Sequence, residues 1–140
     1  MKNRVVEYSS VGHSLRLLIV EDDPIIRRVL ERFSMRKAWK VILAEDGKVA
    51  LDAFRKQEFD VIIMDCHMPK LDGYQTTGEI RQIESQMGTH TPIIALTAND
   101  LAGVREACLN AGMDDYLTKP VELNAFYTIV DQWAGKRLGK

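Results

Sequence analysis

Five residues whose side chains can bind metal ions or phosphoryl groups stand directly after short apolar runs of this sequence. Three of them are carboxylates, and crowded carboxylates repel each other and are costly to keep ionised unless a cation joins them. Oxygen donors without a cysteine or histidine triad favour Mg²⁺. A lysine and a hydroxyl beside them can hold an anion, and aspartate is a known nucleophile in phosphoryl transfer. These residues are Glu21, Asp22, Asp65, Thr97 and Lys119.

Four of the apolar runs have the length and the continuous character of strands that are buried on both faces of a parallel sheet. A fifth run is weaker. The predicted strands cover residues 15–20, 41–44, 61–64, 93–96 and 115–118.

Segments with helical spacing separate these strands. The first begins at Pro24 behind Asp23, because aspartate is a good N-cap and proline suits the first helical position. A second begins near Asp46, a third covers about 73–87, Asn99 can cap a fourth that ends at Gly112, and a fifth covers about 122–134. The residues expected on the apolar faces of the first two helices are Ile25, Val29, Leu30 and Phe33, then Val49, Ala50 and Phe54.

This alternation of strand and helix, repeated five times, predicts an α/β fold with helices on both faces of a parallel sheet. Five strands suit a flavodoxin-like (βα)5 three-layer sandwich with strand order 2-1-3-4-5. Ligands of such sheets bind outside the carboxyl ends of the strands, where all five reactive residues are expected. The residues by themselves therefore indicate Mg²⁺-assisted phosphoryl chemistry, with an aspartate as its centre.

Composition indicates a single globular domain of ordinary character. The chain has 140 residues, is 46% hydrophobic and 28% charged, and carries a net charge of −1, which gives no sign of a surface for nucleic acid or membrane. Cys66 and Cys108 are too few for a disulfide scaffold, and no apolar stretch approaches the ~20 residues of a membrane span, so a cytoplasmic location is expected. The expected division is a linker or leader at 1–14, a domain at 15–134 and a tail at 135–140.

Four stretches of the sequence resemble the signature blocks of response-regulator receiver domains. They occur in the order of that family and, together, extend the resemblance from about Leu15 to Ala134. Four blocks in register are far more specific than one. The stretches are LLIVEDDP, VIIMDCHMPKLDGY, PIIALTAN and AGMDDYLTKP.

The resemblance implies a metal site and a nucleophile. Asp65 matches the phosphoacceptor, Asp22 the acid that binds Mg²⁺ directly, and Glu21 its neighbour that acts through water. His67 matches the position whose backbone carbonyl completes the metal shell. Two residues depart from the usual pattern. Glu21 replaces the commoner aspartate, and His67 is an unusual residue beside the nucleophile. The hypothesis for His67 is that its imidazole contacts the phosphoryl group or tunes hydrolysis of the acyl phosphate.

The resemblance also implies a switch. Thr97 matches the hydroxyl that turns toward the phosphoryl group, Tyr116 the switch aromatic, and Lys119 the lysine that pairs with the phosphoryl group. The bond between Lys119 and Pro120 resembles one that is cis in this family. The implied mechanism is in-line attack by Asp65 on a partner's phosphohistidine, followed by a change of conformation and, later, by hydrolysis. The domain would thus catalyse its own phosphorylation and dephosphorylation.

Three settings are compatible with such a domain. The sequence favours the receiver of a hybrid sensor histidine kinase over a stand-alone response regulator that acts by protein contact. A receiver-like binding module without phosphorylation is disfavoured, because the full set of reactive residues is present. The expected partners are a histidine kinase core or a histidine phosphotransfer domain, with no nucleic acid and no direct membrane contact. Whether phosphorylation also produces a homodimer is left open. No output domain follows in this sequence, so the signal is expected to pass through a partner.

Overall fold

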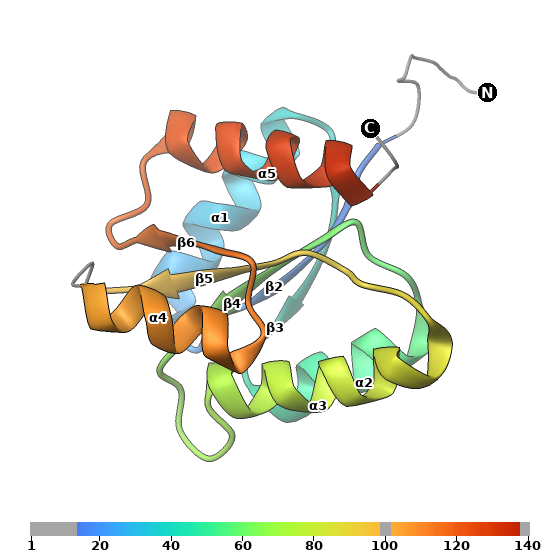
Figure 1. Cartoon of the computed structure of the whole chain (residues 1–140). Helices are drawn as coiled ribbons and strands as arrows, with labels where there is room; N and C mark the ends of the chain where they lie inside the picture. Colours follow the sequence, from blue (N-terminus) through green and yellow to red (C-terminus); the bar gives the residue numbers. More distant parts are fainter. Residues whose placement is uncertain (1–13, 99–101, 138–140) are drawn as a thin grey trace.

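A five-stranded parallel sheet organises the part of the chain that the structure describes, residues 14–98 and 102–137 (Figure 1). The structure is a computed structural model. The strand order β3-β2-β4-β5-β6 confirms the predicted flavodoxin-like order, in which the first strand lies second from one edge. The strands are β2 (Arg16–Val20), β3 (Lys40–Ala44), β4 (Val61–Asp65), β5 (Ile93–Thr97) and β6 (Asp115–Thr118).

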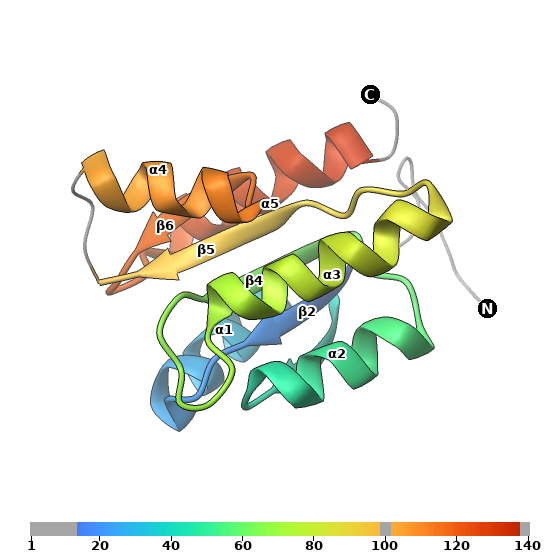
Figure 2. The ribbon, with the colours of Figure 1, turned by 60° about the horizontal axis from the view of Figure 1, so that its bottom comes forward.

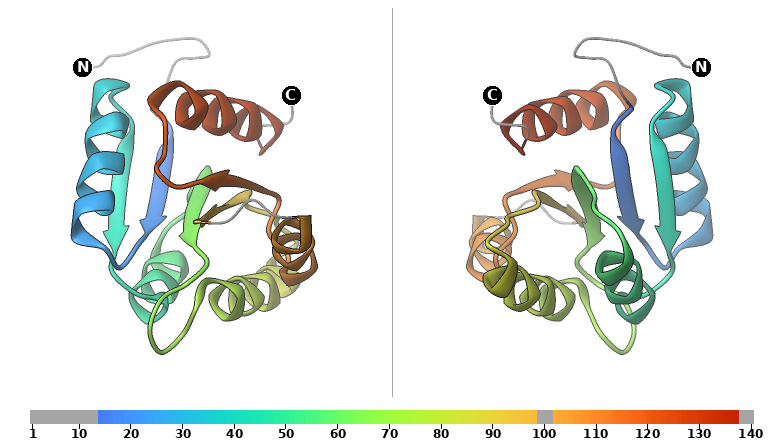
Figure 3. Two further views of the ribbon diagram at one scale, coloured as in Figure 1. Left: turned by 90° about the vertical axis from the view of Figure 1, so that its left-hand side faces the viewer. Right: turned by 90° about the vertical axis from the view of Figure 1, so that its right-hand side faces the viewer.

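Helices cover both faces of the sheet, as the alternation of elements predicts. α1 and α5 lie on one face, and α2, α3 and α4 lie on the other (Figure 1, Figure 3). The cis peptide bond between Lys119 and Pro120 is also present. The helices are α1 (Pro24–Arg36), α2 (Gly47–Lys56), α3 (Gly73–Met87), α4 (Ala102–Ala111) and α5 (Leu123–Arg137).

The central strands show why their apolar runs are continuous. In β4, Ile62 and Met64 pack under α2, α3 and α4, whereas Val61 and Ile63 pack under α1 and α5. Successive side chains of a strand point to opposite faces, so a strand that is covered on both sides needs apolar residues at every position. All five residues of β4 are buried, including its last residue, Asp65, which lies at the carboxyl edge of the sheet.

Acidic residues begin three of the helices. The Asp23 carboxylate accepts a hydrogen bond from the backbone N–H of Ile25 at 2.8 Å, and Asp46 accepts one from that of Val49 at 2.9 Å. Asp72 forms a reciprocal capping box with Gln75 at the start of α3. These contacts confirm the predicted starts at Pro24 and near Asp46. The predicted cap at Asn99 lies outside the described residues, and α5 extends three residues beyond its predicted end at 134, to Arg137.

Three residues that were expected on apolar helix faces are exposed, and that expectation is wrong. Ile25 is 74% exposed, and Val29 and Val49 are both 39% exposed. In α1 the sheet is instead contacted by Ile26, Leu30 and Phe33. None of the helices in the described ranges combines the length with the apolar character needed to cross a membrane.

Candidate functional site

The predicted reactive residues meet at the carboxyl edge of the sheet. This is the edge where α1 begins and where the loop from β4 to α3 lies (Figure 2). Val20 pairs with Met64, so Glu21 and Asp65 follow neighbouring strand positions. Thr97 ends β5, and its carbonyl accepts a hydrogen bond from the Lys119 backbone N–H at 2.8 Å. Glu21, Asp65 and Thr97 are buried, although all three are polar.

Lys119 connects the two buried carboxylates. Its Nζ atom lies 3.1 Å from Asp65 Oδ1 and 3.1 Å from Glu21 Oε1. The lysine side chain is 20% exposed, whereas Glu21 and Asp65 are 0% and 2% exposed. One ammonium group therefore faces two carboxylates that are almost completely removed from water.

Burial governs the electrostatics of this group. Burial raises the pKa of Glu21 to about 7, assisted by the neighbouring Asp65. Burial also raises the pKa of Asp65, against the opposing effect of hydrogen bonds from Lys119 and the His67 backbone. Burial lowers the pKa of Lys119, but the two carboxylates outweigh it, and the net shift is upward. Burial thus favours the protonated forms of Glu21 and Asp65, while the single ammonium group of Lys119 favours their ionised forms.

The carboxylates are arranged as a set of cation ligands. Oxygen atoms of Glu21, Asp22 and Asp65 lie within 4.8 Å of one another. Among the described residues, Asp65 Oδ2 and Glu21 Oε1 have no hydrogen-bond partner, and Glu21 Oε1 forms an ion pair with Lys119. Buried acceptors without partners are costly. Oxygen donors of this kind, one of them on the exposed Asp22, fit a hard divalent cation such as Mg²⁺ that keeps part of its water shell.

Backbone groups hold the acidic side chains in place. The His67 N–H donates to Asp65 Oδ1 at 3.2 Å, and the Asp23 N–H donates to Glu21 Oε2 at 3.0 Å. Gly73 begins α3 directly against the Asp65 carbonyl, where a Cβ atom would overlap the carbonyl oxygen. The close approach of the loop to Asp65 therefore requires glycine at this position.

Arg27 was not predicted as part of this region. Its guanidinium donates to the Glu21 carbonyl at 2.8 Å and, more weakly, to the Asp22 carbonyl at 3.4 Å. It thereby ties the first turn of α1 to the acidic segment after β2. The spacing of residues around Arg27 gives no sign of this role, because its contact with the Glu21 carbonyl depends on how the chain turns from β2 into α1.

The other predicted site residues lie around this centre. The ring of His67 is exposed and lies edge-on to Tyr74, with their centroids 6.1 Å apart. Tyr116 is partly buried and packs against the core under α2, α3 and α4. Cys66 is completely buried, 3.8 Å from Cys108 Sγ, and burial raises its pKa to about 12. Such a thiol behaves as a small apolar side chain rather than as a nucleophile.

Comparison with known proteins agrees with this geometry. The family model described as "Response regulator receiver domain" matches residues 17–131. The sensor histidine kinase GacS of Pseudomonas protegens is 40% identical over 124 residues, which cover 88% of this chain and 14% of GacS. The sensor histidine kinase RcsC of Escherichia coli is 39% identical over 115 residues, covering 82% of this chain and 12% of RcsC. The chain thus spans about one seventh or less of these relatives.

Two solved structures are also similar. The receiver domain of the sensor histidine kinase PA1611 from Pseudomonas aeruginosa has a TM-score of 0.79 and 43% identity, covering 88% of this chain and 99% of that one. It is described as holding a magnesium ion in its active-site cleft. The Ssk1 receiver domain of Saccharomyces cerevisiae, crystallised with the histidine phosphotransfer protein Ypd1, has a TM-score of 0.84 and 31% identity, covering 87% of this chain and 90% of that one.

Proposed function

Because this chain belongs to the response regulator receiver domain family, we propose that Asp65 accepts a phosphoryl group from a phosphohistidine of a partner protein. The chain is a receiver domain of the two-component type, homologous to those of hybrid histidine kinases. One observation carries the assignment to Asp65. Its buried carboxylate is held at Oδ1 by Lys119 and the His67 N–H, whereas Oδ2 has no hydrogen-bond partner among the described residues.

In the proposed reaction, an Asp65 oxygen attacks phosphorus in line with the histidine nitrogen. The new P–O bond forms as the P–N bond breaks, and the imidazole leaves with the electron pair and takes a proton from water. Lys119 is already 3.1 Å from the nucleophile, so its ammonium group can stay close to the phosphoryl oxygens as charge moves onto them. Such pre-positioned charge is the main source of catalysis in phosphoryl transfer.

Glu21, Asp22 and Asp65 would hold Mg²⁺, with the His67 carbonyl as a further ligand. The support is the set of carboxylate oxygens within 4.8 Å of one another and the magnesium ion described for the PA1611 receiver. When bound, Mg²⁺ supplies positive charge to the phosphoryl oxygens. Glu21 fits the position in place of an aspartate because the Asp23 N–H and Lys119 fix the end of its longer side chain.

Thr97 and Tyr116 would move when Asp65 is phosphorylated, and their movement would alter the surface of the domain. Phosphorylation adds about −1.5 to −2 charges, which attract hydroxyl and ammonium donors. Thr97 lies on the strand next to β4, and its backbone is joined to that of Lys119. Tyr116 pairs with Ala95 in the neighbouring strand and packs beneath the helices of that face. We therefore expect the region of α4, β6 and α5 to repack when Thr97 turns toward the phosphoryl group.

The setting favoured by the relatives is the receiver of a hybrid sensor histidine kinase. Such a receiver would lie on the cytoplasmic side of a membrane sensor. Residues 15–134 would be the receiver itself. The proposed partners are the kinase core and a histidine phosphotransfer domain, which is the kind of protein bound to the Ssk1 receiver. The alternative is a stand-alone regulator that acts by protein contact, and transfer from a panel of phosphotransfer domains distinguishes the two.

The test is phosphorylation by a small donor. With acetyl phosphate and Mg²⁺, the intact mass of the protein is expected to rise by about 80 Da, and Asp65→Asn is expected to abolish the gain. Asp52→Asn, which changes an exposed carboxylate of α2, is the matched control and should be labelled like the wild type. A wild type that gains no mass would refute the function. Labelling that persists in Asp65→Asn would show that another residue is the acceptor.

A further inference from the structure

The two cysteines of this chain meet in the core between the sheet and α4. Cys66 directly follows β4, and Cys108 lies in the second half of α4, 42 positions further along the chain. Their Sγ atoms are 3.8 Å apart, and the side chains are 0% and 1% exposed. The sequence contains no other cysteine. Any disulfide within this chain must therefore join these two residues.

The two sulfur atoms are close to the separation of a disulfide. An S–S bond is about 2.05 Å long, so the sulfur atoms have to approach each other by less than about 2 Å. The backbone of Cys66 is held on both sides: its N–H donates to the Leu96 carbonyl at 3.0 Å, and its carbonyl accepts from the Gly73 N–H at 3.1 Å. The adjustment therefore comes from rotation of the two side chains and from movement of α4.

Among the helices that cover this face of the sheet, α4 has the smallest buried surface. Of its residues 103–111, only Cys108 is buried, and Val104 is partly buried against the same core. α2 and α3 bury four and five residues on this face. Figure 2 shows α4 next to α3, at the end of the layer. Segments with few buried contacts open locally at a low free energy, so movement of α4 away from the sheet is what exposes the two sulfur atoms.

We propose that Cys66 and Cys108 form a modification site, which a low-molecular-weight disulfide of the glutathione type oxidises to a disulfide when α4 opens. The new bond ties α4 to the carboxyl end of β4. Its effect on signalling rests on the proposed function, because α4 belongs to the region that is expected to repack after phosphorylation of Asp65. A covalent bond between α4 and the residue that follows Asp65 restrains this repacking.

The oxidation is a thiol–disulfide exchange in two steps. The thiolate of Cys108 attacks one sulfur of the small disulfide, whose S–S bond breaks, and the other half leaves and takes up the proton that Cys108 lost. The thiolate of Cys66 then attacks the Cys108 sulfur in the mixed disulfide, and the second half leaves as a thiol in the same way. Two electrons thus pass from the two cysteines to one small disulfide, which is reduced to two thiols.

Burial protects the pair while α4 is closed. It raises the pKa of Cys66 to about 12, and only the thiolate attacks a disulfide. Cys108 reacts first because it lies on the helix that moves, and Cys66 follows as the nearest thiol. Oxidation is therefore slow in the closed form, and its rate reports how often α4 opens.

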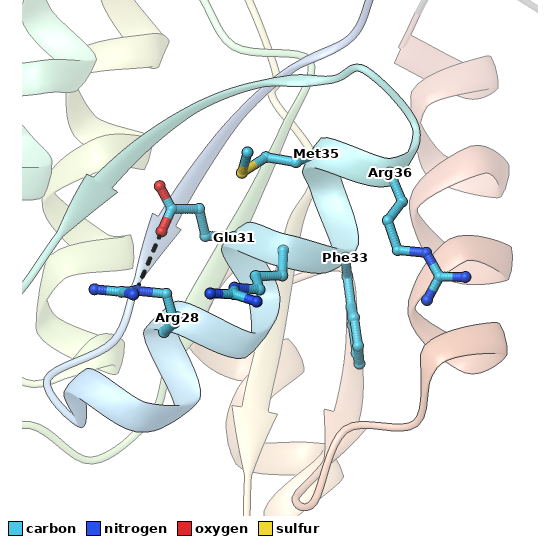
Figure 4. Close-up of a pocket in the computed structure, with 6 residues that line it drawn as sticks. Arg28, Glu31, Phe33, Met35 and Arg36 are labelled. Atoms are coloured by element: carbon cyan, nitrogen blue, oxygen red, sulfur yellow. Dashed lines mark ion pairs between the residues drawn. The ribbon is translucent and has the colours of Figure 1, made fainter.

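The experiment treats the whole chain of 140 residues with oxidised glutathione and follows its intact mass. Cys108→Ala removes one partner of the pair. The control is a single exposed thiol, made by Met35→Cys in a chain whose two native cysteines are replaced by alanine. Met35 is 65% exposed and lines an open depression of α1, on the other face of the sheet (Figure 4). Circular dichroism checks that each variant is folded.

We expect the wild type to lose about 2 Da, because two thiols become one disulfide. The control should instead gain about 305 Da and stop at the mixed disulfide, since its thiol has no neighbour. Cys108→Ala should not lose mass. The oxidation of the wild type should be at least about tenfold slower than modification of the control, because α4 must open first. The oxidised wild type should melt about 5–15 °C higher than the reduced protein, since the bond closes a loop of 42 positions.

Hydrogen exchange tests whether the bond holds α4. Amide exchange in α4 should be at least about tenfold slower in the oxidised than in the reduced protein. Phosphorylation by acetyl phosphate should change this exchange at least about threefold in the reduced protein and less than about 1.5-fold in the oxidised protein. Dithiothreitol should restore the reduced behaviour.

An unchanged mass under conditions that modify the control completely would overturn the inference, as would two stable glutathione adducts or a disulfide-linked dimer. A disulfide that leaves exchange in α4 unchanged would overturn the role of the bond in holding this helix. The decisive mass measurement uses the wild type, so it does not depend on whether Cys108→Ala folds. Failure of acetyl phosphate to label the reduced wild type would refute the proposed function, whereas the change in mass on oxidation tests the thiol pair independently of phosphorylation.

Discussion

Replacement of Arg81 by alanine is expected to destabilise this domain more than the replacement of any exposed residue by alanine. Arg81 in α3 donates to the Gly112 carbonyl at 2.8 Å and to the Thr91 carbonyl at 2.9 Å. It also forms ion pairs with Glu84 and, at 2.8 Å, with Asp114. The guanidinium thus joins α3 to the segments that precede β5 and β6.

The size of the effect follows from what the substitution leaves behind. The Glu84 side chain is only 2% exposed and that of Asp114 is 15% exposed, so both carboxylates would lose their guanidinium partner in a poorly hydrated place. Removal of one partner of a buried ion pair costs about 3–5 kcal/mol. Backbone N–H groups of Thr91 and Ile93 continue to donate to the two carboxylates, which favours the lower end of that range. We therefore expect a loss of about 3 kcal/mol from the free energy of unfolding, or roughly 10 °C in Tm.

The assay is equilibrium unfolding in urea, with circular dichroism and tryptophan fluorescence as two probes. Arg55→Ala is the matched control, because Arg55 and Asp52 form an exposed pair at 4.0 Å that should contribute less than about 0.5 kcal/mol. A double-mutant cycle of Arg81 and Asp114 isolates their coupling. If Arg81→Ala lowers the free energy of unfolding by less than about 1 kcal/mol and shows no measurable coupling to Asp114, the conclusion that this buried network stabilises the fold is refuted.

Three further predictions concern the edge of the sheet that carries the site. Gly73→Ala should cost about 1–3 kcal/mol of stability and slow the labelling of Asp65, because the new Cβ displaces the Asp65 backbone. Gly78→Ala, on the exposed side of the same helix, is the control and should stabilise the protein by about 0.5–1 kcal/mol. Equal behaviour of the two variants in urea unfolding and in intact-mass labelling would show that this assignment is wrong. Asp23→Ala should cost about 1 kcal/mol through loss of the α1 cap, and an unchanged urea midpoint would contradict this. Mg²⁺ at about 100 times its Kd should raise the free energy of unfolding of the wild type by about 2.7 kcal/mol. If thermal melts show the same gain for Asp22→Asn, Asp22 is not a ligand of the ion.

The sequence alone was sufficient for the features that depend on neighbouring residues. Apolar runs such as 61–64 are strands because residues buried on both faces must all be apolar. The starts of α1 and α2 follow from Asp23 and Asp46, whose side chains cap backbone N–H groups two or three residues away. The convergence of Asp65, Glu21 and Lys119 also follows from the alternation of elements, because parallel strands bring their carboxyl ends to one edge.

Contacts that depend on distant elements could not be predicted in this way. The spacing of Ile25 and Val29 is that of an apolar helix face, and only the packing angle of α1 on the sheet decides that they face outward beside Lys119. Arg81 meets Asp114, 33 residues away, through a fold that no local pattern encodes. Glu21 is also buried only because several elements of the fold together exclude water from it, and this burial raises its pKa to about 7. Chain-local hydrogen bonding and periodicity determine which elements form, whereas the placement of these elements decides which side chains lose water and which remain available to a partner.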